Sequence, residues 1–500
     1  MNLLMGIDLG TSGLKTIIVE EKGKVLAEEK CSYSFDSPKP GYAEQDPDVW
    51  WHACKSTVTK LMNFCRSEDI SGLGFSGQMH GLVMLDVNYQ SVRPAILHCD
   101  TRSTKQVEEL QSIFGTEEIR NLMMNAVYTG FLLPSLLWVK ENEPQTYEKI
   151  RYVCLPKDYL KLKITGELST DYSDASGTLA FDIKNLCWSE EILDRLSLEI
   201  EIFPQCYKST DRMGSVSLEA AKITGLSAGT PVMAGGGDQV MQGIGNGMIN
   251  VGDATVNIGS SGQVSFQVDR PVFNSNLSTN TFCSYQKDRW LLLGATMTAG
   301  LSLKWWHQII GDVDYRQMDR EVAAIQPGSS GILFLPYLNG ERTPHVDPNL
   351  SGMFLGINIG ASQANMTRAV MEGVAYSLMQ AIEVCGELGF SATSFVASGG
   401  GARSQPWLQL QADIYNVPIR VATSEEQAGL GAAIVAGVGA GIYSDLGEGC
   451  LAAVRYREDL IYPDTTNHQI YLEYYELYKE IYSSNKLLLN KITMMGRGNT

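Results

Sequence analysis

The chain has 500 residues, 44% hydrophobic and 19% charged, a balance typical of a globular protein large enough for two or more cores. Its 56 acidic and 39 basic residues give a net charge of -17, which makes nucleic acid and anionic membrane surfaces poor partners. The ten cysteines form no Cys-x-x-Cys pair and the amino terminus lacks the basic region of a signal peptide, so we expect reduced thiols, no zinc site and a cytoplasmic protein.

The first pattern in the chain predicts a β-hairpin around a glycine-rich turn. Apolar residues at 3–7 and 16–19 flank the turn, in which glycines expose backbone N–H groups while hydroxyls and one ammonium add donors. The residues expected to hold phosphate are Gly10, Thr11, Ser12 and Lys15. Asp8 would repel a bare phosphate, but Mg²⁺ between them removes the repulsion, so the turn predicts Mg²⁺ and a nucleoside triphosphate. Taken alone, the segment is better explained as an ordinary hairpin turn.

Residues 47–65 are predicted to form a helix with Trp50 on its packing face. The next pattern, residues 72–86, is again a strand, a glycine-bounded turn and a strand. Gln78 and His80 lie in that turn, where they suit hydrogen bonding to a polyhydroxylated substrate. A surface turn with an incidental histidine is the alternative.

The middle of the chain supplies a candidate catalytic carboxylate. Residues 103–200 have mainly helical patterns, and the polar segment at residues 170–177 predicts a loop without a specific role. An apolar run at residues 230–234 then leads into three glycines and Asp238. A helix that begins there would favour the carboxylate through its dipole, and we expect Asp238 to receive or orient the proton of an attacking hydroxyl. A plain helix N-cap is the alternative.

A glycine-rich segment at residues 243–247 predicts a hinge between two halves, residues 1–245 and 246–500. Beyond it, residues 254–266 repeat the opening pattern of strand, Gly-hydroxyl-hydroxyl-Gly turn and strand, with Gly259 and Ser260 in the turn. Two such hairpins suggest halves of similar architecture that face one shared nucleotide.

The second half alternates strands and helices. Helices are expected at residues 299–309 and from residue 363, the latter carrying Arg368 and Glu372 as an ion pair on its outer face. A strand at residues 394–397 then leads into a glycine-rich turn that leaves room for an adenine ring. Residues of that turn include Gly400, Gly401 and Ser404.

The end of the chain is predicted to be helical. Residues 425–438 should form a helix that completes a βαβ-like second half. An amphipathic helix at residues 469–492 closes the chain. Its expected core stripe consists of Ile470, Tyr474, Leu477 and Ile481.

Together and in this order, these motifs resemble the FGGY family of carbohydrate kinases along essentially the whole chain. The motifs lie at residues 6–12, 235–238, 258–262 and 399–404. The resemblance implies an α/β fold of two ribonuclease H-like domains of the actin and hexokinase type, with the active site in the cleft between them. Residues 77–81 and 336–345 are further similar to the xylulokinase branch of that family.

Carried over by position, the resemblance implies that Asp238 is the catalytic base, that Asp8 holds Mg²⁺, and that Met79 and His80 line the sugar site. The ATP phosphates would contact Gly10, Thr11, Ser12, Lys15, Gly259 and Ser260. Positions near the nucleoside would be Gly300, Lys304, Gly400, Gly401 and Ser404. Gln239 and Ser260 depart from the Asn and Thr usual in the xylulokinase branch, so the sugar is less constrained than the reaction.

The resemblance therefore implies ATP-dependent phosphorylation of D-xylulose to D-xylulose 5-phosphate. Another acceptor, such as ribulose, glycerol or gluconate, is an alternative. A protein of the actin group that hydrolyses ATP without a sugar is a third possibility. A homodimer is implied by the family alone.

Overall fold

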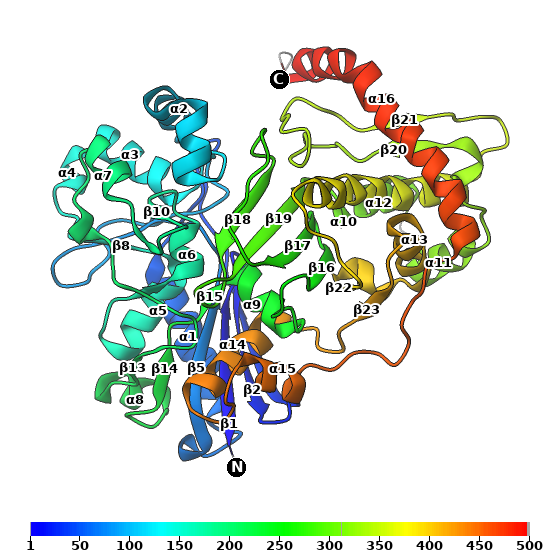
Figure 1. Cartoon of the computed structure of the whole chain (residues 1–500). Coiled ribbons are helices and arrows are strands. Elements are labelled where there is room, and N and C mark those ends of the chain that lie inside the picture. Colours follow the sequence, from blue (N-terminus) through cyan, green and yellow to red (C-terminus); the bar gives the residue numbers. More distant parts are fainter. Residues whose placement is uncertain (1, 312, 498–500) are drawn as a thin grey trace.

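The computed structural model describes residues 2–311 and 313–497, and two β-sheets covered by helices organise them (Figure 1). The first sheet has the strand order β13 (Arg212–Ser215), β14 (Pro231–Met233), β5 (Ile70–Gly77), β1 (Leu3–Leu9), β2 (Gly13–Glu20), β3 (Val25–Ser32), and β15 (Gly236–Gly237) also pairs with β5. The second sheet has the order β18 (Thr279–Cys283), β19 (Trp290–Thr296), β17 (Gly262–Val268), β16 (Ala254–Ile258), β22 (Phe395–Gly399), β23 (Ile419–Val421). Within the described ranges, every helix is too short or too polar to span a bilayer.

The predicted hairpin β1–β2 lies at the centre of the first sheet and is buried on both faces. Leu3, Met5 and Ile7 pack into one core, whereas Leu4 and Ile17 pack into the core on the other side. Because neighbouring side chains of a strand point to opposite faces, a strand covered on both sides is apolar throughout. The continuous apolar run at the amino terminus is explained in this way.

Different helices cover the two faces of the first sheet. One face carries α1 (Pro47–Leu61), α5 (Pro156–Thr165) and α8 (Leu218–Thr224), and Trp50 of α1 is fully buried there as predicted. The other face carries α9 (Asp238–Gly245), α14 (Gln427–Gly439) and α15 (Leu446–Ala453).

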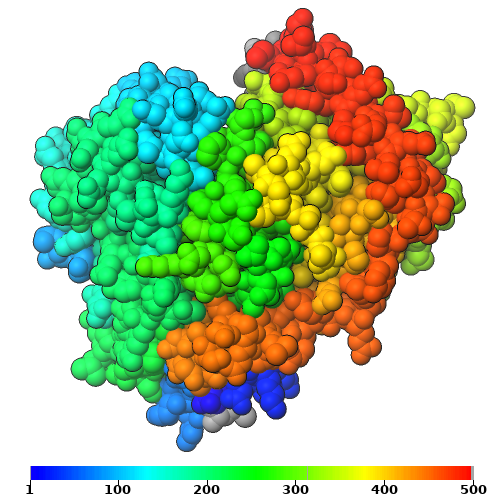
Figure 2. All heavy atoms as spheres, in the orientation of Figure 1, coloured from blue at the N-terminus to red at the C-terminus, as the bar shows by residue number. Residues whose placement is uncertain are grey.

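Helix α14 was predicted to complete the second half, and that prediction was wrong. It packs against β1 and β5 of the first sheet and against α9. The contact is so close that a Cβ atom on Gly6 would lie 2.0 Å from the carbonyl oxygen of Gly429, and one on Gly74 would lie 1.9 Å from that of Ala432. In Figure 2 this orange segment lies against the blue N-terminal strands at the base of the molecule. A helix that is apolar all round carries no sign of which sheet it will cover.

A separate lobe with its own hydrophobic core is built from residues between β5 and β13 (left in Figure 1). Its main elements are β6 (Val83–Leu85), β7 (Ala95–Ile96), α2 (Thr104–Glu118), α3 (Leu132–Asn142), α4 (Pro144–Tyr147), β8 (Tyr152–Cys154) and α7 (Glu190–Arg195). The prediction of a plain loop at residues 170–177 was wrong. That segment forms β9 (Thr170–Asp171) and the short helix α6 (Tyr172–Ser176), most of which is buried because charged partners from α5 compensate its polar groups.

The second sheet packs against α12 (Gln363–Glu387), with α10 (Gly300–Ile309), α11 (Tyr315–Ala323) and α13 (Gln405–Tyr415) around that helix. Arg368 and Glu372 of α12 were expected on an outer face, but their exposed fractions are only 8% and 1%. The Arg368 guanidinium donates to Glu372, 2.8 Å away, and to the hydroxyl of Tyr471, 2.6 Å away. The pair is buried because the C-terminal helix covers it.

That C-terminal helix, α16 (Thr465–Arg497), runs along the outside of the second half (red in Figure 1). The predicted stripe was wrong in its register: Ile470 and Leu477 are exposed, and of the four predicted residues only Ile481 is buried. The buried face instead consists of Tyr471, Tyr475, Tyr478, Ile481 and Leu489. Their rings pack well while the hydroxyls find partners, which hydrophobicity alone does not reveal.

Candidate active site

Both sheets place their glycine-rich turns at the carboxyl ends of neighbouring parallel strands. In the first sheet β1 and β5 run parallel, with Asp8 opposite Ser76, and Gly237 of β15 pairs with the end of β5. In the second sheet β16 and β22 run parallel, with Ile258 opposite Gly399. The carboxyl ends of such strands are where open α/β sheets bind ligands.

A cavity of about 300 Å³ is lined by residues from both halves of the chain. Four of the residues predicted for catalysis and sugar binding line it, namely Gln78, Met79, His80 and Asp238. Arg342, from the segment 336–345, lines it as well, and polar residues of the cavity that the sequence did not single out include His98, Tyr128, Thr129, Gln263, Asn280 and Thr296. The cavity is large enough for a small polyol.

Asp238 is the first residue of α9, with Gly237 at the N-cap. Its pKa is raised to about 7, first by burial and then by the charge of Asp8, while a hydrogen bond from the Gln239 backbone opposes the rise. Met79 lies against the adjoining glycine, since a Cβ atom on Gly237 would come within 2.8 Å of the Met79 sulfur. A carboxylate at a helix N-terminus with a pKa near 7 is suited to accept a proton at neutral pH.

The backbone of His80 has a φ of 74°, a left-handed conformation that residues other than glycine rarely adopt. Its ring stacks on Phe131 at 4.0 Å between centroids, and its Nδ1 lies 2.7 Å from the carbonyl oxygen of Gly177. Burial lowers the pKa of His80 to about 3, so the ring is neutral. Because a carbonyl only accepts, Nδ1 carries the proton and Nε2 is left as an acceptor for a hydroxyl.

Gln78 joins the sugar turn to the first phosphate hairpin. The Thr11 hydroxyl donates to its Oε1 at 3.0 Å, and its backbone N–H donates to Leu9 at 2.8 Å. Its amide Nε2 is buried and has no hydrogen-bond partner among the described residues. A buried donor without a partner costs free energy, about 1–3 kcal/mol, unless a ligand oxygen accepts from it.

The first hairpin brings three charged groups together. Burial is the main cause that raises the pKa of Asp8, the hydroxyl of Ser76 lowers it, and Glu426 raises it further. Lys15 stands opposite Asp8 across the hairpin and forms an ion pair with Glu426, which precedes α14. The ammonium predicted to contact phosphate therefore also ties this hairpin to the helix beneath the sheet.

The second hairpin is held against the start of α10. The N–H groups of Ala299 and Leu301 donate to the carbonyl of Ser260 at 2.9 and 3.1 Å. Gly300 donates to the carbonyl of Gly259 at 2.8 Å, and a Cβ atom on Gly300 would lie 2.4 Å from that oxygen. The structure thus brings together three residues that were predicted for ATP binding from distant parts of the sequence.

The residues predicted to bind the nucleotide all lie outside the 300 Å³ cavity. Gly401 packs on Ile258, so the glycine-rich turn that also contains Gly400 lies beside the second hairpin. The Ser404 hydroxyl caps α13 and donates to Asp319 at 2.6 Å. Lys304 is exposed on α10, one turn after Gly300.

Comparisons with known proteins agree with this arrangement. The pattern of the FGGY family of carbohydrate kinases matches the chain in two parts, the N-terminal domain at residues 3–245 and the C-terminal domain at residues 254–440. The chain is similar to the xylulose kinase of Bacillus subtilis (strain 168), with 37% identity over 489 residues that cover 97% of this chain and 98% of that protein.

Solved structures show the same similarity. A "xyloylose kinase" from Brucella ovis superposes with a TM-score of 0.92 at 33% identity and covers 97% of this chain and 100% of that chain. A gluconate kinase from Lactobacillus acidophilus superposes with a TM-score of 0.92 at 26% identity, over 98% of this chain and 99% of that chain. These likenesses confirm the predicted two-domain α/β fold.

Proposed function

This chain belongs to the FGGY family of carbohydrate kinases, as its motifs predicted, and on that premise we propose that it transfers the terminal phosphoryl group of ATP to D-xylulose. Xylulose kinases with 35% and 37% identity over nearly the whole chain favour this sugar. One observation carries the proposal: the Asp238 carboxylate, with its pKa near 7, opens into a cavity that polar side chains line on both sides. A homodimer and a cytoplasmic location stay predictions.

In the proposed reaction the terminal hydroxyl of the sugar lies against Asp238. The carboxylate accepts the hydroxyl proton as the oxygen attacks phosphorus, and the dipole of α9 holds the carboxylate in place. His80 accepts from a second hydroxyl through Nε2, and the unpaired Nε2–H of Gln78 donates to an oxygen of the sugar or of the phosphate. Positioning and electrostatics provide most of the rate in phosphoryl transfer, so the side chains need to be held rigidly.

The residues present also fit Mg²⁺ and ATP. The charge of Asp8 contributes to the raised pKa of Asp238, and a divalent cation would stabilise two carboxylates in this arrangement. Asp8 would hold Mg²⁺, while the hairpin turns at residues 10–13 and 259–262 would direct N–H groups to the phosphates. When bound, Mg²⁺ would neutralise charge on the transferred group. Exclusion of water would follow from closure of the two halves about the glycines at residues 243–247.

The first experiment is ADP release with Mg²⁺ and ATP across D-xylulose, D-ribulose, glycerol, gluconate and no acceptor. We expect a strong preference for D-xylulose, and the Asp238→Asn variant should lose about 10²- to 10⁴-fold in kcat with an unchanged melting temperature.

Turnover should fall as the pH decreases through about 7, because protonated Asp238 cannot accept a proton. Near wild-type turnover by Asp238→Asn would remove the base role, and hydrolysis that no acceptor stimulates would favour an actin-like ATPase.

Gluconate is the second candidate acceptor because Arg342 lines the cavity. Its backbone is fixed, since the buried carboxylate of Glu341 accepts from the N–H groups of Arg342 and Met297, both at 2.7 Å. A permanent positive charge in this place would pair with a sugar carboxylate. If gluconate is the substrate, Arg342→Gln should raise its KM far more than the KM of any neutral sugar.

A further inference from the structure

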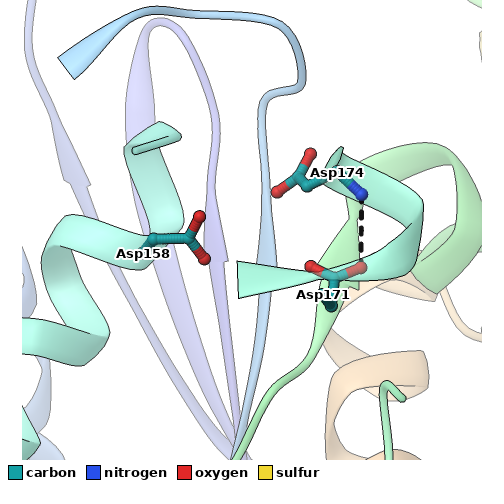
Figure 3. A group of neighbouring side chains, drawn as sticks. All are labelled: Asp158, Asp171 and Asp174. Carbon is teal, nitrogen blue, oxygen red and sulfur yellow. Dashed lines mark hydrogen bonds between the residues drawn. The ribbon is translucent and has the colours of Figure 1, made fainter. Parts of the chain in front are cut away.

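A cluster of charged side chains lies fully buried beside the backbone that leads into Asp238. Asp158, Asp171 and Asp174 point their carboxylates toward a common centre (Figure 3). The ammonium of Lys157 lies 2.7, 2.6 and 2.7 Å from them. Lys157 therefore takes the position that a metal ion would need, and its ion pairs with Asp174 of α6 and with the N-cap residue Asp171 fix that helix.

That helix, α6, is tied to the backbone just before Asp238. The carboxylate of Asp171 caps α6 by accepting from the N–H of Ser173 at 2.8 Å and from the Ser173 hydroxyl. The same hydroxyl oxygen accepts from the N–H of Gly237 at 2.9 Å. One serine thus connects the buried charge cluster to the residue that precedes the proposed base.

Further bonds from the same cluster reach other parts of the site. The ammonium of Lys161 lies 3.0 Å from Asp158 and donates to the carbonyl of Ala234 at 2.8 Å. The carbonyl of Gly177, directly after α6, is the partner of His80. The Ser176 hydroxyl oxygen accepts from the N–H of Cys283 at 2.9 Å, on the edge strand β18 of the second sheet. Figure 1 shows α6 between the left lobe and β18.

We propose that Ser173 is a positioning residue for Asp238, and that α6, anchored by Lys157, sets the geometry of the phosphoryl acceptor site. The inference rests on the proposed function, because it concerns the same base. Ser173 itself does not line the sugar cavity, so it acts through the backbone of Gly237. A small displacement of a reacting group lowers the rate of transfer steeply while leaving substrate affinity almost unchanged.

Ser173→Ala is the informative variant, since removal of Lys157 would leave the buried carboxylates of Asp171 and Asp174 without their cation and would threaten folding. We expect Ser173→Ala to lower kcat for D-xylulose by roughly 10- to 100-fold, with the KM for the sugar within about twofold of the wild type. Ser173→Cys keeps a weak donor and acceptor and should give an intermediate kcat.

The matched control is Ser189→Ala. Ser189 is also a buried serine whose hydroxyl oxygen accepts from a backbone N–H, that of Ile192 at 3.3 Å, but it caps α7 in the left lobe. We expect Ser189→Ala to reduce the melting temperature as Ser173→Ala does, with kcat unchanged. A general loss of stability would lower the melting temperature of both variants alike, so it could not explain a kcat that falls in Ser173→Ala alone.

The proposal is overturned if Ser173→Ala has the kcat of Ser189→Ala, or if it raises KM without lowering kcat. If Ser173→Ala does not fold, Ser173→Cys takes its place. Hydrogen exchange that shows weaker protection of the Gly237 amide would mean that its hydrogen bond is lost, and a wild-type kcat in that variant would then overturn the proposal equally. Wild-type protein and Asp238→Asn are measured in parallel. If the wild type phosphorylates no acceptor, the proposed function fails, and if Asp238→Asn keeps its turnover, the role of Asp238 as base fails. If these two behave as expected, only the role of Ser173 is at stake.

Discussion

The two phosphate hairpins share a frame and differ in charge. Residues 10–13 and 259–262 have the same order of glycine, two hydroxyl residues and glycine, and each follows a central strand of its sheet. Two positions before the first glycine, one hairpin has Asp8 and the other has Asn257. Both halves thus have an uncharged glycine-rich turn for phosphate, and only the first half adds a carboxylate next to it.

The neighbouring strands repeat the same correspondence. Asp8 lies opposite Ser76 of β5, and Asn257 lies opposite Ser398 of β22. A triphosphate between two carboxylates would be repelled from both sides, whereas one carboxylate and one amide leave a single place for a cation. The difference predicts that the first hairpin binds both Mg²⁺ and phosphate, whereas the second binds phosphate alone.

Asp8→Asn makes the first hairpin like the second and should have the largest effect. We expect kcat to fall by about 10³-fold, because the side chain that would hold Mg²⁺ loses its charge. Initial rates over a range of Mg²⁺ concentrations provide the measurement, and added Mg²⁺ should restore only part of the activity. Unchanged kinetics would show that Asp8 does not serve the metal.

Asn257→Asp makes the reverse change. A second carboxylate near the phosphates should raise the KM for ATP by about tenfold through repulsion, with a smaller change in the KM for sugar. Asn257→Leu is the control, since it removes the amide without adding charge. If both variants raise the KM for ATP equally, the loss of the amide and not the new charge is responsible.

Lys15→Met removes an ammonium that the second hairpin lacks, because Lys15 lies opposite Asp8 in the first hairpin whereas Gln263 lies opposite Asn257 in the second. We expect the KM for ATP to rise by about fivefold, equivalent to roughly 1 kcal/mol. Glu426→Gln, which breaks the ion pair from the other side, should leave the KM for ATP close to that of the wild type. Equal effects of the two variants would mean that Lys15 acts through Glu426 and not on phosphate.

Ser260→Ala is expected to have the smallest effect, a rise of about threefold in the KM for ATP, because a single neutral hydrogen bond contributes roughly 1 kcal/mol or less. The carbonyl of Ser260, which binds the start of α10, is retained in this variant. A rise of more than about 30-fold in the KM for ATP, measured with saturating sugar, would mean that the Ser260 hydroxyl contributes more to ATP binding than one neutral hydrogen bond.

The sequence predicted those parts of the site that depend on local pattern. Both hairpins, the helix that begins at Asp238 and the turn with His80 form where the spacing of glycines and apolar residues placed them. Their local hydrogen bonds largely determine their shape. The roles of the individual residues remain predictions.

What the sequence could not predict depends on partners distant in the chain. Residues 170–177 look like a polar loop until Lys157 neutralises them, and Arg368 looks exposed until α16 covers it. His98 joins the cavity through tertiary packing, without a motif of its own, and the segment 336–345 gave no sign that Arg342 would line it. Burial of a charged residue cannot be read from periodicity when its partner lies on another element.

The packing of α14 has a consequence for the order in which the protein can be made. Ribosomes build the first sheet early, but the face that contains Leu4 and Ile17 is fully covered only after synthesis has passed α9 and reached residue 439, the end of α14. Until then the nascent sheet exposes an apolar surface, including the glycines on which α14 will later pack. Synthesis of residues 1–245 alone should therefore give a species that chaperones retain and that aggregates when released, and adding residues 427–453 in trans is the direct way to rescue it.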